Sequence, residues 1–140
     1  MNNLDRFKIA QEKDYETALN EIKNGRKQTH WIWYIFPQVA GLGMSSTSQY
    51  YGIGDLSEAR EYLADSILRE RLLEITGELL LLPDKNAERI MGYVDAMKLR
   101  SSMTLFHRAD PNCKVFSAVL DKYFDGEEDW KTLTILSHTE

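Results

Sequence analysis

The segment that decides the fold of this 140-residue chain is Trp31-Ile32-Trp33-Tyr34-Ile35-Phe36, a run of bulky side chains that no charged residue interrupts. Aromatic and β-branched residues in such a run suit a buried strand as well as a helix that is apolar on every side. No second convincing strand stands elsewhere in the sequence, and an isolated strand would leave buried backbone groups without hydrogen bonds. We therefore expect residues 27–36 to form a central helix that ends at Pro37.

Apolar residues at helical spacing predict further helices on both sides of this segment. The clearest begins after Asp65, where leucine and isoleucine residues recur every three or four positions until Pro83. The other expected helices cover residues 13–24, preceded by one or two turns from residue 4, and residues 57–63, 86–106, 113–124 and 129–136. The sequence thus predicts an all-α fold: a compact, orthogonal helical bundle of about six to seven helices, with residues 1–140 in a single domain.

The stretch from Gln38 to Gly54 is the longest expected loop, and it is rich in glycine and serine. Loops of this length in compact domains are more often functional than idle. Two interpretations of Gly41 and Gly43 stay open: their loop forms a backbone nest for an anion, or the glycines only turn the chain. The loop lacks the third glycine of a dinucleotide fingerprint and the Gly-Lys-Ser/Thr ending of a Walker loop.

Composition limits the classes of function. Lysine and arginine number 17 against 22 aspartate and glutamate residues, giving a net charge of −5, so no general basic surface exists to hold nucleic acid. The lone cysteine, the N-terminus without an apolar leader and the absence of a long apolar run favour a soluble cytoplasmic protein that does not bind membranes. The histidines show no metal-ligand spacing, so we expect no metal and no cofactor.

A polar stripe interrupts an expected apolar helix face. Lys98, Ser101 and Ser102 stand between Val94 and Leu105 at spacings of three and four residues. A buried lysine needs a carboxylate, a ligand or a wet pocket, and Asp95 is the simple structural partner. A lysine-activated serine nucleophile is the weaker alternative, because the lysine precedes both serines instead of following one as in Ser-x-x-Lys.

A basic group stands at the entrance to the apolar segment. Lys27 and His30 lie three residues apart and so share one side of the expected helix. In one interpretation Lys27 stacks on Trp31 and His30 is a hydrogen-bonded core residue. In the other they face an anion, with His30 as a general acid or base.

Long motifs run through the chain in a recognisable order. They read Gly-Arg-Lys-x-x-His-Trp-x-Trp-Tyr-Ile-Phe-Pro-Gln at 25–38, Gly-Leu-Gly-x-Ser at 41–45 and Asp-Ala-x-Lys-Leu-Arg-Ser-Ser-Met-Thr-Leu-Phe at 95–106. Together they resemble the family of domain of unknown function 1810 over nearly the whole chain. The resemblance implies a compact all-helical, bacterial-type domain and brings little function. The calpastatin-like label sometimes given to such proteins does not guide us, because calpain inhibitors of that type are disordered, repeated segments.

These polar groups support a pocket that binds a small anionic ligand, phosphate-bearing or nucleotide-like. His30 and Lys98 are the candidate catalytic residues, and we expect Trp31 or Trp33 to stack against the ligand. The candidate ligand-binding residues are Lys27, Trp31, Gln38, Gly41, Gly43, Ser45, Ser101, Ser102 and Thr104. The alternative is a non-enzymatic protein-interaction or structural module in which the polar cluster is an internal network.

Overall fold

The computed structural model describes residues 3–139 of the chain, and over that range the fold is all-α and compact. The described residues form nine helices: α1 (Asp5–Lys23), α2 (Ile32–Ile35), α3 (Ser46–Tyr50), α4 (Leu56–Ala64), α5 (Ser66–Leu81), α6 (Ala87–Met91), α7 (Tyr93–Ala109), α8 (Lys114–Phe124) and α9 (Trp130–Thr139). They form no named strand, and their only sheet-like pairing is an isolated parallel bridge between Val39 and Ile53. The all-α prediction is confirmed.

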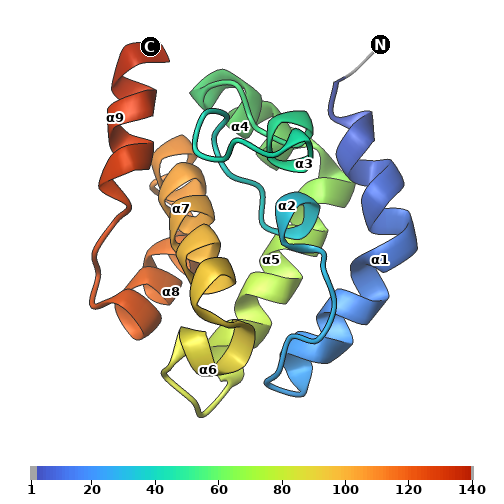
Figure 1. The fold of residues 1–140 in the computed structure, drawn as a ribbon. Helices are drawn as coiled ribbons and strands as arrows, with labels where there is room; N and C mark the ends of the chain where they lie inside the picture. The colour runs from blue at the N-terminus through green and yellow to red at the C-terminus, as the bar shows by residue number, and fades with distance from the viewer. Residues whose placement is uncertain (1–2, 140) are drawn as a thin grey trace.

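The helices surround one apolar core. α1 and α9 lie on opposite sides of the molecule, with α5 and α7 between them (Figure 1). α1 packs against α5, and α7 packs against α4, α6, α8 and α9. Every helix except α3 contributes buried apolar side chains, and the largest fully buried ones include Trp31, Tyr62, Phe7, Phe36 and Phe106.

α5 shows why these helices form where they do. Its N-cap residue Asp65 accepts hydrogen bonds from the amides of Ile67 and Leu68, at 3.0 and 3.1 Å. The regular apolar stripe that predicted the helix is buried along its length. At the other end, the Lys122 ammonium donates to carbonyl oxygens of the last turn, where a cation is favoured by the helix dipole.

The expected helix over residues 27–36 is wrong in its first half. Only α2, a single turn inside the apolar run, is helical. The amides of Gln28 and Thr29 instead donate to the carboxylate of Glu21, at 2.8 and 3.0 Å. A side chain from α1 thus holds this stretch by its amides, and the chain stays irregular up to the apolar run.

The helix count of six to seven is also wrong, for two local reasons. Gly92 has φ of +86° and divides the expected helix 86–106 into α6 and α7, because this backbone conformation cannot continue a right-handed helix. The expected loop 38–54 contains α3, whose N-cap Ser45 accepts a hydrogen bond from the Ser48 amide at 3.1 Å. The expected turns from residue 4 are continuous with α1.

Candidate functional site

A groove of about 480 Å³ lies between α7, the start of α9 and the segment that precedes and includes α3. α7 contributes its first three turns, so the groove follows the exposed side of that helix. The side chains and backbone atoms that line it belong to Gln38, Leu42, Gly43, Ser48, Tyr93, Val94, Met97, Lys98, Ser101, Asp129, Trp130 and Lys131.

Lys98 carries the clearest charge in this groove. Its ammonium lies 4.9 Å from the centre of the Trp33 ring, a cation–π distance. Within residues 3–139 it forms no ion pair, although acidic residues outnumber basic ones in the chain. A half-buried lysine without a carboxylate partner leaves positive potential at the groove wall.

Asp129 is the acidic residue of the groove, and its carboxylate is already engaged. One oxygen, Oδ2, lies 3.1 Å from the Ser101 hydroxyl and accepts from the amide and hydroxyl of Thr132 at 3.1 and 2.6 Å. Its own amide donates to the Thr104 hydroxyl at 2.9 Å. Asp129 therefore caps α9 and ties it to α7, and these hydrogen bonds offset part of its negative charge.

The wall formed by the segment from Gln38 to Ser48 is held through its pairing with the chain after α3. Ile53 donates its amide to the Gln38 carbonyl at 2.9 Å, and Ala40 donates to the Ile53 carbonyl at 2.7 Å. The two segments pass so closely that a Cβ on Gly52 would lie 2.8 Å from the Ala40 Cα. Only glycine fits there without moving the backbone.

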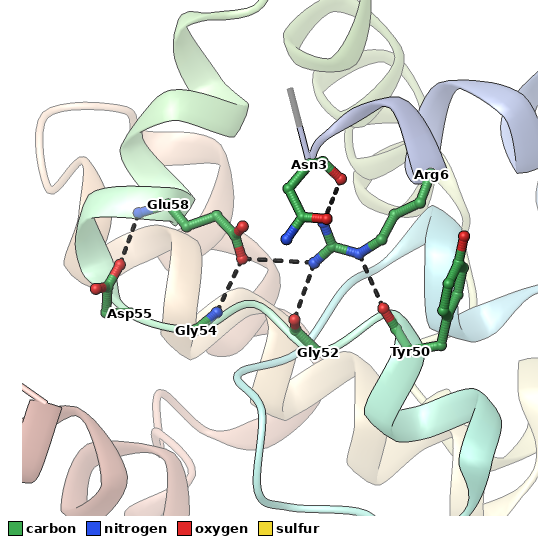
Figure 2. Close-up of polar contacts among 7 residues, drawn as sticks. All are labelled: Asn3, Arg6, Tyr50, Gly52, Gly54, Asp55 and Glu58. Atoms are coloured by element: carbon green, nitrogen blue, oxygen red, sulfur yellow. Dashed lines mark hydrogen bonds and ion pairs between the residues drawn. The ribbon is translucent and has the colours of Figure 1, made fainter. Parts of the chain in front are cut away.

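Arg6 of α1 fastens the segment that returns after α3, as Figure 2 shows. Its guanidinium donates to the carbonyls of Tyr50 and Gly52, each at 2.9 Å, and also to the carbonyl of Asn3. Glu58 lies 3.4 Å from the same guanidinium and accepts from the Gly54 amide at 2.9 Å. This charged, buried fork holds the returning segment by its carbonyls, and the wall pairs with that segment at Gln38 and Ala40.

The structure brings some of the predicted site residues to this groove and places others elsewhere. Gln38, Gly43, Lys98 and Ser101 line it. Gly41 is exposed nearby, and the Ser45 side chain caps α3. The Thr104 hydroxyl lies in the Asp129 network, and the Ser102 hydroxyl is buried with no hydrogen-bond partner among the described residues.

Lys27 and Trp31 belong to a separate structural cluster, and His30 does not line the groove. The Lys27 ammonium pairs with Asp95 at 2.7 Å, with 5% of the lysine side chain exposed, so Asp95 pairs with Lys27 and not with Lys98. Lys27 also lies over the Trp31 ring at 4.8 Å. Trp31 is 1% exposed and donates its indole N–H to Glu21 at 2.9 Å, whereas His30 is exposed.

Sequence reasoning missed the aromatic rim of the groove. Trp130 is 66% exposed, and Tyr93 and Val94 are 64% and 63% exposed, although Val94 was expected on the buried stripe. Their positions in the sequence could have indicated this exposure. Trp130 directly follows a helix cap, and Tyr93 directly follows a helix-breaking glycine.

The described residues provide neither a cluster of metal ligands nor a membrane-spanning helix. Between residues 3 and 139, no group of three or more His, Cys, Asp or Glu is placed to hold a metal ion. No helix in the same range is long and apolar enough to cross a membrane.

Comparison with known proteins gives a family and a fold. A family model described as "Protein of unknown function (DUF1810)" matches residues 1–136. The crystal structure of the conserved hypothetical protein Rv1873 from Mycobacterium tuberculosis superposes with a TM-score of 0.94 at 43% sequence identity, covering 96% of each chain. No curated protein matches the sequence.

Proposed function

Because this chain belongs to the DUF1810 family, whose description names no activity, we propose a function from the geometry of the groove: it binds a small anionic ligand, phosphate-bearing or nucleotide-like. The observation that carries the proposal is Lys98, a lysine in a groove wall that forms no ion pair within residues 3–139. Removing a cation partly from water without a counter-charge costs free energy, and a bound anion would supply that counter-charge.

The surrounding groups suit such a ligand. Gln38 and Ser48 are neutral hydrogen-bonding residues on the wall opposite Lys98, and Lys131 adds a second cation at the start of α9. The volume of about 480 Å³ falls within the usual range of small-molecule sites. His30 does not line the groove, so the proposal is binding, with Lys98 as the remaining candidate for any proton transfer.

The alternative, an internal structural network, has support of its own for some of the residues. Ser101 and Thr104 both hydrogen-bond with Asp129, and that arrangement holds α9 on α7 without any ligand. Lys98 takes no part in these bonds. The two functions therefore make different predictions for Lys98.

The test is the variant Lys98→Met, with Lys13→Met as a matched control on the exposed face of α1. A panel of nucleotides, sugar phosphates and other anionic metabolites should contain compounds that raise the melting temperature of the unmodified protein, because a ligand of the native state stabilises it by mass action. Lys98→Met should abolish that rise while its free energy of unfolding stays within about 0.5 kcal/mol of the unmodified protein.

Lys13→Met should keep the ligand response unchanged. Strong destabilisation of Lys98→Met, by about 2 kcal/mol or more, would show that Lys98 belongs to a structural network. An undiminished ligand response in Lys98→Met would also contradict the proposal.

A further inference from the structure

The exposed aromatic side chains at the groove are not explained by anion binding alone. Trp130 and Tyr93 are both about two-thirds exposed, on the two helices that border the groove. Large apolar side chains gathered at one concave site favour a binding role, because each leaves apolar surface in water. Because these side chains border the proposed anion site, a ligand that contacts both the aromatic rings and Lys98 must have an apolar part as well as an anionic group.

The rings of these two residues have no aromatic partner among the described residues. The Lys131 ammonium lies over the Trp130 ring at 6.0 Å from its centre, a looser cation–π contact than the 4.9 Å between Lys98 and Trp33. The other tryptophans are occupied. Trp31 packs against Phe36 and Lys27, and Lys98 covers a face of Trp33.

We propose, building on the anion site above, that the ligand carries a flat aromatic ring joined to its anionic group, as in a nucleoside monophosphate. The ring stacks on Trp130 at the start of α9, and Tyr93 borders the opposite end of the groove. The anion pairs with Lys98 between them. Trp130 is then the residue that determines specificity for the ring, in place of Trp31 or Trp33.

Charge and size favour this small ligand over a protein partner. The two lysines of the groove, Lys98 and Lys131, face one carboxylate, and that carboxylate is already hydrogen-bonded to Ser101 and Thr132. The groove is therefore locally positive in a chain with a net charge of −5. Its volume of about 480 Å³ admits a ring with a sugar and a phosphate.

The experiment compares three probes by isothermal titration: AMP, adenosine, which lacks the anion, and ribose 5-phosphate, which lacks the ring. We expect AMP to bind at least about tenfold more tightly than ribose 5-phosphate, because of base stacking, and than adenosine, because of the phosphate that pairs with Lys98. Trp130→Leu should lower AMP affinity to that of ribose 5-phosphate, whereas Trp130→Phe should retain most of the difference.

A second readout is fluorescence. Trp130 is the exposed tryptophan, so AMP should quench the long-wavelength edge of the emission, and Trp130→Leu should remove that change. Both Trp130 variants should fold normally, because Trp130 is not in the core. Their far-ultraviolet circular dichroism spectra should match that of the unmodified protein.

The outcomes separate this inference from the proposed function. Equal affinities for ribose 5-phosphate and AMP would overturn the ring inference and leave the anion site intact. Equal affinities for adenosine and AMP would overturn the anion site. Unchanged AMP affinity in Trp130→Leu, or no binding of AMP at millimolar concentration, would overturn the ring inference as well.

Discussion

Replacing Lys27 with methionine should destabilise the fold by roughly 3 kcal/mol, whereas the same replacement of Lys98 should cost less than about 0.5 kcal/mol. The sequence places both lysines at one candidate site, with Lys27 as a ligand-binding residue and Lys98 as a candidate catalytic residue. The structure gives them different surroundings, because Lys27 has an ionic partner at 2.7 Å and Lys98 has none within residues 3–139.

The magnitude follows from what Lys27→Met leaves behind. Breaking a buried ion pair costs about 3–5 kcal/mol, since the remaining charge is stranded. Asp95 keeps 20% of its side chain exposed and regains some hydration, which places the expected cost at the lower end. That figure includes the lost cation–π contact with Trp31, worth roughly 0.5–1 kcal/mol, and the methionine side chain retains the apolar packing of the lysine.

Urea unfolding followed by circular dichroism measures the difference. With a slope of about 2 kcal/mol per molar, Lys27→Met should lower the midpoint by roughly 1.5 M and Lys98→Met should leave it almost unchanged. Lys23→Met, on the exposed end of α1, is the control for loss of a positive charge. Equal midpoints for Lys27→Met and Lys98→Met would refute the assignment of Lys27 to a structural pair.

Three further changes test other parts of the structure. Burial alone would raise the pKa of Glu21, but hydrogen bonds from two amides, a hydroxyl and an indole N–H lower it to about 2. The stabilisation from this carboxylate is therefore present above its ordinary pKa of 4.5 and is lost as the pH falls towards 2. Glu21→Gln should lower the free energy of unfolding at pH 7 and make it depend less on pH between 4.5 and 2. An unchanged dependence on pH in that range would contradict the prediction. Asp129→Ala should cost about 1–2 kcal/mol and speed amide exchange in α9 but not in α1, and uniform exchange would show that the cap does not act locally. Gly52→Ala should cost at least about 2 kcal/mol, because its Cβ meets backbone at 2.8 Å, and a stable Gly52→Ala protein would show that the loop can move.

Local periodicity predicted the long helices well because their stripes face one core. α5 and α8 have nearly the expected bounds. The carboxylates of Asp65 and Asp129 accept hydrogen bonds from amides in the first turns of α5 and α9. The irregular stretch before α2 escaped prediction because Glu21, a residue of α1, supplies its hydrogen bonds. A contact of that kind exists only after the elements have packed. The break at Gly92 was visible in the sequence, but glycine within a helix is too common to locate a boundary.

The sequence predicted the site residues correctly only where their positions depend on which face of a helix they occupy. The spacing of Lys98 and Ser101 placed both on one side of α7, and both line the groove. Spacing did not predict which lysine has a carboxylate partner, since Asp95 lies three residues from Lys98 yet pairs with Lys27. The exposure of Trp130 depends on where α9 begins relative to α7, and that is a property of the packed molecule.

The hydrogen bonds of Arg6 determine which segments must accompany this groove if it is transferred to another protein. The bonds from Arg6 to Tyr50, Gly52 and Glu58 join positions that lie 44 to 52 residues apart in the chain, so the shape of the segment after α3 depends on α1 and α4 as well as on its own sequence. A synthetic peptide spanning residues 38–54 should be unstructured in water, because it lacks the guanidinium that gathers its carbonyls. A graft that keeps the binding surface must therefore carry the first turn of α1 and the start of α4 as supports, even though neither touches a ligand.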